Sequence, residues 1–264
     1  MVIEKALELS KHRKAFIMAT VVEAKGSAPA KSGSKLIYTE DKELFGTVGG
    51  GLVEAKVLEE AERALQNKEN KILEYNLTKT EKGIGMNCGG SVKVFLEVFL
   101  PQYRLLLCGG GHVGYEIAKL ASQLKIETLL LEERSHIATE ERFPSVCRRI
   151  VRDHYQEALA EIEIDEYTLI AIVTKGSSTD EVVLEGVINS PAPYIGMMGS
   201  QRKKLEILKS MELKGYDREL LEKVHCPIGL DLKAITPEEI ALSVIAEMVA
   251  VKNGGTGNKL KKQF

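Results

Sequence analysis

The fold is decided by the stretch Arg104-Leu105-Leu106-Leu107-Cys108-Gly109-Gly110-Gly111-His112-Val113-Gly114. An apolar strand runs here into a glycine-rich turn, which a helical stretch and a second apolar run, residues 128–131, then follow. Gly109 permits the tight turn, Gly111 lets the backbone approach a pyrophosphate, and Gly114 lets the helix lie close to the strand. This order predicts a dinucleotide-binding βαβ unit.

Both ends of this predicted unit offer groups to a ligand. The helix N-terminus presents free N–H groups and a positive dipole end to phosphates, and His112 lies where its side chain can approach a pyrophosphate or a substrate. Glu132 ends the second strand, where an acid accepts hydrogen bonds from a ribose and favours NAD over NADP. The alternative is a glycine-rich turn in an α/β protein that binds no ligand.

Composition narrows the possible partners. The chain has 264 residues, 36 basic and 38 acidic, no tryptophan and a net charge of −2. A balanced charge recruits neither nucleic acid nor a membrane surface, and the apolar stretches are too short to span a bilayer. We therefore expect no nucleic-acid and no membrane partner. The four widely spaced cysteines form no CxxC, which predicts no metal site, and they favour reduced thiols in the cytoplasm.

The patterning predicts an α/β protein of two domains. Residues 1–101 read as a smaller α+β domain, with helices at 2–9 and 52–66 and strands at 16–22, 35–39, 43–48, 71–77 and 91–100. Residues 102–264 read as a Rossmann-like domain with a C-terminal helix, because strands at 104–108, 127–132, 148–151, 167–173 and 193–197 alternate with helical stretches. That alternation predicts a parallel sheet with helices on both faces.

Further loops are candidates for chemistry. Gly49, Gly50 and Gly51 precede a helix whose first turn holds Glu54, and their consecutive N–H groups can bind an anion; a plain strand-to-helix turn is the alternative. Cys88 lies in the glycine loop 85–90, whose flanking glycines leave the thiol room to act as a nucleophile or sulfur ligand. A small buried hydrophobe is the alternative, although it is less usual between glycines than elsewhere.

Two more loops follow predicted strands of the parallel sheet, whose carboxyl ends bind ligands. One begins at Thr174. The other contains Gly199, Ser200 as a helix cap, and Arg202 among three basic side chains, which suits a phosphate; a solvated basic helix face is the alternative. The sequence contains no HExxH and no Ser/His/Asp set at a recognisable spacing, which argues against a metalloprotease or hydrolase.

The loops together resemble those of the XdhC/CoxI family, accessory proteins that mature molybdenum-containing hydroxylases. The resemblance spans nearly the whole chain and rests on seven blocks: residues 26–29, 46–54, 85–90, 109–114, 132–134, 196–203 and 227–239. It implies a protein that binds the molybdenum cofactor (molybdopterin) as cargo, supports its sulfuration by a cysteine desulfurase, and delivers it to an apo molybdenum hydroxylase such as xanthine dehydrogenase. Cys88 is then the thiol nearest the metal.

The chain also departs from the family pattern. Many relatives carry Ser-Gly-Gly-Cys where this chain has Gly49-Gly50-Gly51-Leu52, which favours the xanthine dehydrogenase-type branch. Thr174 and Asp180 match the loop after the fourth Rossmann strand, whereas its usual histidines are missing.

We expect a homodimeric cofactor-binding chaperone rather than a stand-alone enzyme. Two alternatives share the fingerprint: an oxidoreductase that uses NAD(P), and a nucleotide-sensing regulatory module without catalysis.

Overall fold

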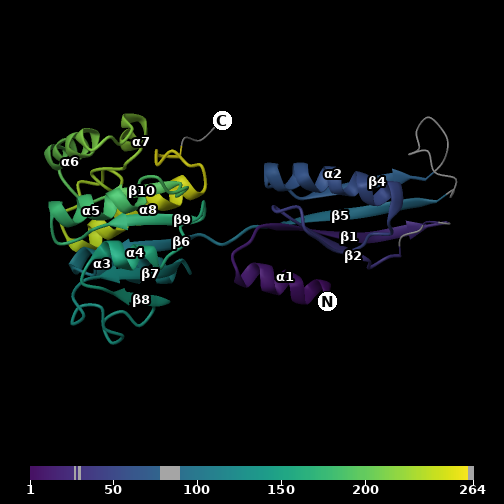
Figure 1. Cartoon of the computed structure of the whole chain (residues 1–264), viewed down its shortest axis with the longest axis horizontal. Coiled ribbons are helices and arrows are strands. Elements are labelled where there is room, and N and C mark those ends of the chain that lie inside the picture. Colours follow the sequence, from purple (N-terminus) through teal and green to yellow (C-terminus); the bar gives the residue numbers. More distant parts are fainter. Residues whose placement is uncertain (27, 29–30, 78–89, 261–264) are drawn as a thin grey trace. The chain divides into compact units, whose positions relative to one another are not determined.

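A computed structural model describes residues 1–26, 28, 31–77 and 90–260. The chain divides into two compact units, Met1–Gln102 and Tyr103–Phe264 (Figure 1). Each unit has its own sheet and its own hydrophobic core.

The first unit is an antiparallel sheet with one helix on each face. Its strands lie in the order β3-β2-β1-β5-β4. The elements are α1 (Val2–Lys11), β1 (Phe16–Lys25), β2 (Lys35–Thr39), β3 (Leu44–Gly46), α2 (Gly51–Asn67), β4 (Lys71–Asn76) and β5 (Ser91–Phe99). Side chains alternate across β1, so that Phe16 and Met18 pack with α1 while Ile17 and Ala19 pack with α2.

Helix α2 forms because its apolar residues recur at helical spacing. Val53, Val57 and Ala61 are fully buried against the sheet. The helix begins after Gly50 and ends at Lys68, which adopts the left-handed conformation. This unit confirms the smaller α+β part of the predicted fold.

The second unit is a parallel sheet with helices on both faces, as predicted. The strand order is β10-β9-β6-β7-β8. The elements are β6 (Arg104–Cys108), α3 (His112–Gln123), β7 (Glu127–Glu132), β8 (Arg148–Val151), α4 (Tyr155–Ala160), β9 (Thr168–Ile172), α5 (Ser177–Val187), β10 (Tyr194–Met197), α6 (Gln201–Leu213), α7 (Arg218–Glu222) and α8 (Pro237–Lys252).

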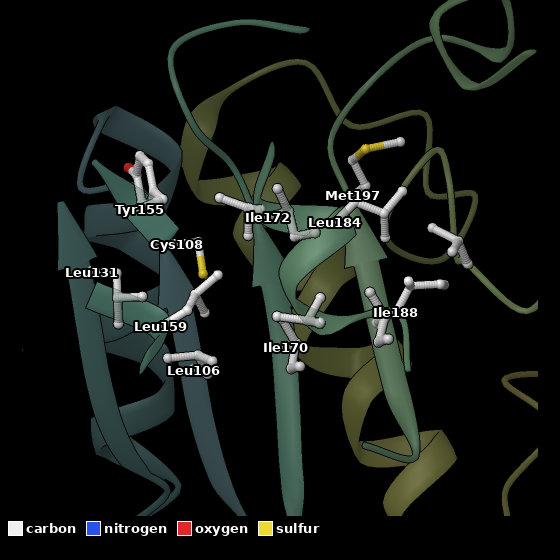
Figure 2. Packing of buried hydrophobic residues seen from close by; sticks show 14 of the residues in the cluster. Leu106, Cys108, Leu131, Tyr155, Leu159, Ile170, Ile172, Leu184, Ile188 and Met197 are labelled. Atoms are coloured by element: carbon white, nitrogen blue, oxygen red, sulfur yellow. The ribbon is translucent and has the colours of Figure 1, made fainter. Parts of the chain in front are cut away.

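Both faces of this sheet are buried, because its central strands are apolar throughout. Leu106, Cys108 and Ile170 face α4 and α5 (Figure 2), whereas Leu105 and Leu107 face α3 and α8. The chain leaves β6 for β7 and β8 on one side and returns to place β9 on the other. That reversal forms a crevice between the carboxyl ends of β6 and β9, where ligands of open α/β sheets bind.

The sheet has one extension that the sequence pattern does not predict. His225 forms a parallel bridge with Gly196 of β10, through the hydrogen bonds His225 N–H to Ile195 O and Met197 N–H to His225 O, both 2.9 Å. Segment 224–228 therefore continues the sheet beyond β10.

Candidate functional site

The glycine loop after β6 has the close packing that the fingerprint predicts. Gly109 has φ +112°, and a Cβ there would overlap the carbonyl oxygen of Val173 in the neighbouring loop. A Cβ on Gly114 would overlap the carbonyl oxygen of Gly109. These two glycines hold the strand, the turn and α3 close together.

Gly111 differs from them, since a Cβ there would meet no atom within 4 Å. It is the N-cap of α3, and in the described part of the chain no side chain caps this helix end. His112 follows as an exposed first helical residue. The start of α3 thus combines open space with a helix N-terminus, an arrangement suited to a phosphate.

Glu132 lies at the end of β7 with its side chain 1% exposed. Its carboxylate accepts hydrogen bonds from the Gly110 N–H (2.7 Å), the Arg134 N–H (3.0 Å), and Nε and Nη2 of Arg134 (2.8 and 2.9 Å). Burial alone would raise the pKa of Glu132, but these hydrogen bonds outweigh it and hold the pKa below its usual value. Glu132 thereby braces the glycine loop; its predicted ribose contact stays a prediction.

A buried acid, Asp180 in α5, joins the loops after β9 and β10. It accepts hydrogen bonds from the Thr174 N–H (3.2 Å) and hydroxyl (2.6 Å), and it is ion-paired with Nζ of Lys203. Lys203 also donates to Met198 O at 2.9 Å. Since the Asp180 side chain is 1% exposed, this pair is a fixed link between the loops after β9 and β10.

The basic loop after β10 starts α6. Ser200 is its N-cap and accepts a hydrogen bond from the Lys203 N–H at 3.2 Å. Arg202 is 89% exposed and pairs with Glu206, while Lys204 donates to Val224 O at 3.1 Å. Of the three basic side chains, that of Arg202 therefore extends furthest into solvent.

The described cysteines are not activated nucleophiles. Burial raises the pKa of Cys108, and nearby Asp180 raises it further. Burial also raises the pKa of Cys226, beyond what Lys204 and Lys203 offset, and burial and Glu127 raise the pKa of Cys147. All three stay protonated at neutral pH. Cys88 lies outside the described residues.

In the first unit, N–H groups of the glycine loop before α2 donate hydrogen bonds to a side chain of the same protein. The Glu54 carboxylate accepts hydrogen bonds from the Thr47 hydroxyl (2.5 Å), the Val48 N–H (3.1 Å) and the Gly50 N–H (3.3 Å). Gly49, Gly50 and Gly51 all have positive φ, which permits this tight wrapping. The predicted anion at this loop is, in the structure, a carboxylate of the same chain.

The sheet topology brings most of the predicted residues of the second unit to one edge. The carboxyl ends of the parallel strands, with the loops just after them, hold Gly109, Gly111, Glu132, Thr174 and Ser200. Sequence reasoning did not anticipate the links that Glu132, Asp180 and Lys203 make between these loops. A charge in each loop was visible, but the pairing of charges 23 residues apart was not.

A second polar network was also missed. Glu247 of α8 accepts hydrogen bonds from the Tyr194 hydroxyl (2.6 Å) and the Gly229 N–H (2.8 Å), and it lies 3.1 Å from Nδ1 of His225. This network ties the sheet extension to α8, and its advance signal was an acid, Glu247, within the apolar run 244–251.

The described residues were also compared with what a metal site and a membrane span need. Across residues 1–26, 28, 31–77 and 90–260, no three His, Cys, Asp or Glu side chains gather as a metal site. Within the same ranges, no helix is both long and apolar enough to cross a membrane.

Comparison with known sequences covers both units. The model of the XdhC Rossmann domain matches residues 105–248, and that of the XdhC and CoxI family matches residues 9–76. YqeB of Escherichia coli K12 is 31% identical over 97% of this chain, which spans only 47% of that protein's length. The molybdenum cofactor insertion chaperone PaoD of the same organism is 24% identical, over 94% of this chain and 86% of PaoD.

Two further proteins are similar to this chain over most of its length. A protein of Bacillus subtilis described as a probable xanthine dehydrogenase component is 18% identical over 89% of this chain and 93% of its own length. The crystal structure of a protein described as a xanthine dehydrogenase from Bacillus halodurans covers 96% of each chain at 19% identity, with a TM-score of 0.54, which supports the fold. From its Rossmann unit, its N-terminal unit and these matches, the chain belongs to the XdhC and CoxI family.

Proposed function

We propose that this chain is a maturation factor that binds the molybdenum cofactor, supports its sulfuration and delivers it to a xanthine dehydrogenase-type hydroxylase. Family membership, together with the end-to-end similarity to a protein named as a molybdenum cofactor insertion chaperone, carries the proposal. The partners that it implies are an apo molybdenum hydroxylase and a cysteine desulfurase. A homodimer in the cytoplasm remains our expectation for the acting form.

The residues of the second unit fit such a cargo. Molybdopterin carries a phosphate, and its nucleotide form carries a pyrophosphate. The open space at Gly111 and the uncapped start of α3, within the described residues, suit that anion. Thr174 and the Ser200–Arg202 segment lie after neighbouring strands and would line the same crevice.

A thiol of this chain that takes part in sulfuration must form a thiolate readily at neutral pH. The pKa values of Cys108, Cys147 and Cys226 are raised, which disfavours the nucleophilic thiolate in each. We therefore keep Cys88, from the glycine loop 85–90, as the thiol that serves this step. Cys88→Ser should weaken maturation and leave folding unchanged, because a hydroxyl is a poor soft ligand.

A second candidate function is an NAD(P)-dependent oxidoreductase. The Rossmann loop geometry at Gly109–Gly114 favours it as much as it favours a pterin cargo. His112 is exposed beside that loop and is the residue that would exchange a proton with a substrate.

A reconstitution assay separates these functions. Purified chain is mixed with molybdenum cofactor, a cysteine desulfurase with cysteine, and an apo-hydroxylase, and hydroxylase activity is followed in parallel with NADH oxidation. We expect the chain to raise hydroxylase activity, and Gly111→Asp to abolish that gain. Thr236→Asp is the matched control, since it adds the same carboxylate at the N-cap of α8. NADH turnover without any gain in hydroxylase activity would support the oxidoreductase instead.

A further inference from the structure

The acid that would bind a ribose in this fold, Glu132, already accepts hydrogen bonds at both carboxylate oxygens. Glu132 accepts four hydrogen bonds, from the Gly110 N–H, the Arg134 N–H and two guanidinium nitrogens, between 2.7 and 3.0 Å. A carboxylate has about four lone-pair sites, so none remains for the two hydroxyls of a ribose. With a side chain 1% exposed, Glu132 also lacks contact with solvent, from which a ribose would arrive.

The exposed group at the end of β7 is instead a cation. The Arg134 side chain is 32% exposed, and its hydrogen bonds to Glu132 use Nε and Nη2. A guanidinium has five N–H donors, so both N–H groups of Nη1 and one of Nη2 lie beyond this pair. The bidentate pairing fixes the plane of the guanidinium, which reduces the entropy lost when a further anion binds.

Glu132 balances the charge of this guanidinium, and the next acid along the chain, Glu133, is held by a different cation. Glu133 is paired with Lys175, from the loop after β9, at 2.8 Å, and the Glu133 side chain is 20% exposed. Lys175 itself is 55% exposed. The end of β7 therefore presents a guanidinium and an ammonium toward solvent, while both carboxylates are engaged.

We infer that this part of the site binds a phosphate monoester through Arg134 in place of an unsubstituted ribose. The inference rests on the proposed function, because it assigns a ligand class to the same crevice. Two sources share this chemistry: the 2′-phosphate of an NADP-like nucleotide, and the single phosphate of molybdopterin, which would then lie at Arg134 and not at the start of α3. Arginine binds such phosphates bidentately through charge-assisted hydrogen bonds. The preference for NAD that Glu132 suggests in the sequence is thereby reversed.

The test compares matched ligand pairs by calorimetry on the full chain. One pair is 2′-phospho-ADP-ribose against ADP-ribose; the other is the oxidised fluorescent pterin of the cofactor with and without its phosphate. In the pair that represents the true source, we expect the phosphorylated member to bind about 10- to 100-fold more tightly. Arg134→Gln should reduce this ratio to near one, and Arg134→Lys should retain part of it.

Arg142→Gln is the control, because Arg142 is another arginine of the same unit, 5.6 Å from the ring centre of Tyr115. It should leave the ratio unchanged. Since Arg134 also supports Glu132, thermal unfolding of each variant identifies a loss that reflects folding, and Arg134→Lys keeps a charge at the position. An equal affinity within both pairs, or a ratio that Arg134→Gln leaves intact, overturns the inference. So does a failure of all four ligands to bind.

The two proposals can fail separately. If the phosphate preference depends on Arg134 but the chain never raises hydroxylase activity, the ligand class stands and the maturation role is wrong. If the chain matures the hydroxylase but shows no phosphate preference, the maturation role stands and the assignment of Arg134 is wrong.

Discussion

Two glycine-rich loops of this chain look alike in sequence and differ in what occupies them. The loop before α2 ends in Gly49-Gly50-Gly51, and the loop before α3 contains Gly109-Gly110-Gly111. In the first, Glu54 from the first turn of the helix accepts hydrogen bonds from the loop. In the second, the first turn of α3 holds no acid, and Gly111 faces open space.

The difference shows how an anion site is kept for a ligand. A helix N-terminus attracts negative charge whatever its source, so a carboxylate placed in the first turn satisfies it internally. The second loop has a carboxylate too, that of Glu132, but it takes the Gly110 N–H from the strand side and leaves the start of α3 open. Of these two loops, we therefore expect the second to bind a ligand.

The largest effect on the difference between the two loops is expected when the second loop also receives an acid. Gly111→Asp places a carboxylate at the N-cap of α3, where it would hydrogen-bond to the helix N–H groups. Because this carboxylate fills the phosphate position and repels the ligand, we expect affinity for the phosphate-bearing cofactor to fall roughly 100-fold or more, about 3 kcal/mol. Calorimetry measures the affinity.

The folded state should tolerate this change. Gly111 has φ −63°, and a Cβ there meets no atom within 4 Å, so the melting temperature should stay constant or rise slightly. Gly111→Asn is the matched variant, with similar size and no charge, and it should lose less affinity. Binding by Gly111→Asp at the wild-type level would show that the second loop does not hold phosphate.

The sequence predicted the architecture well, for a physical reason. The strands at 104–108, 127–132 and 148–151 have the predicted bounds. Apolar runs such as 105–107 and 129–131 are a local signal, because the strand pattern is carried by neighbouring residues. Helix α8 also begins at a local signal, the capping box of Thr236 and Glu239.

The site was predicted less completely, because its links are not local. The order of residues does not show that Lys203 pairs with Asp180. It also does not show that Glu132 accepts hydrogen bonds from Gly110 and Arg134. Such pairings depend on which strands become neighbours. The contact between Glu54 and the loop before α2 could have been predicted from the sequence, since an acid four residues after Gly50 lies in the first helical turn.

A second prediction concerns the acids that organise the turns. Asp180 is almost fully buried and paired with Lys203, whereas Glu54 is only partly buried. Asp180→Asn leaves Lys203 without its counter-charge, and we expect the free energy of unfolding to fall by about 3 kcal/mol. Urea denaturation measures it. Combining Asp180→Asn with Lys203→Met should restore part of the loss, and a double variant less stable than the single one would contradict this account.

A third prediction uses pH to test the brace at the second loop. Hydrogen bonds to Glu132 hold its pKa below the usual value of about 4.3, so its charge stabilises the folded state above that pH. This contribution is lost as pH falls through the lower folded-state pKa. Glu132→Gln should therefore be less stable than wild type by about 1–2 kcal/mol at pH 7, and the difference should shrink as pH falls below the usual carboxyl pKa of about 4.3 and through the lower folded-state pKa. Urea denaturation between pH 3 and 7 checks this, and a difference that stays constant across that range would show that the charge of Glu132 does not matter.

The smallest effect is expected at the first loop, where the comparison can be inverted. Glu54→Ala removes the carboxylate from the Thr47 hydroxyl and the Val48 and Gly50 N–H groups, and should cost about 1 kcal/mol of stability. The exposed N–H groups should then attract an external anion, so that sulfate raises the melting temperature of Glu54→Ala more than that of wild type. Glu59→Ala, an exposed position on the same helix, removes the same charge and should behave like wild type. If sulfate stabilises all three proteins equally, the N–H groups of the first loop are not a latent anion site, and the contrast between the two loops does not arise from Glu54.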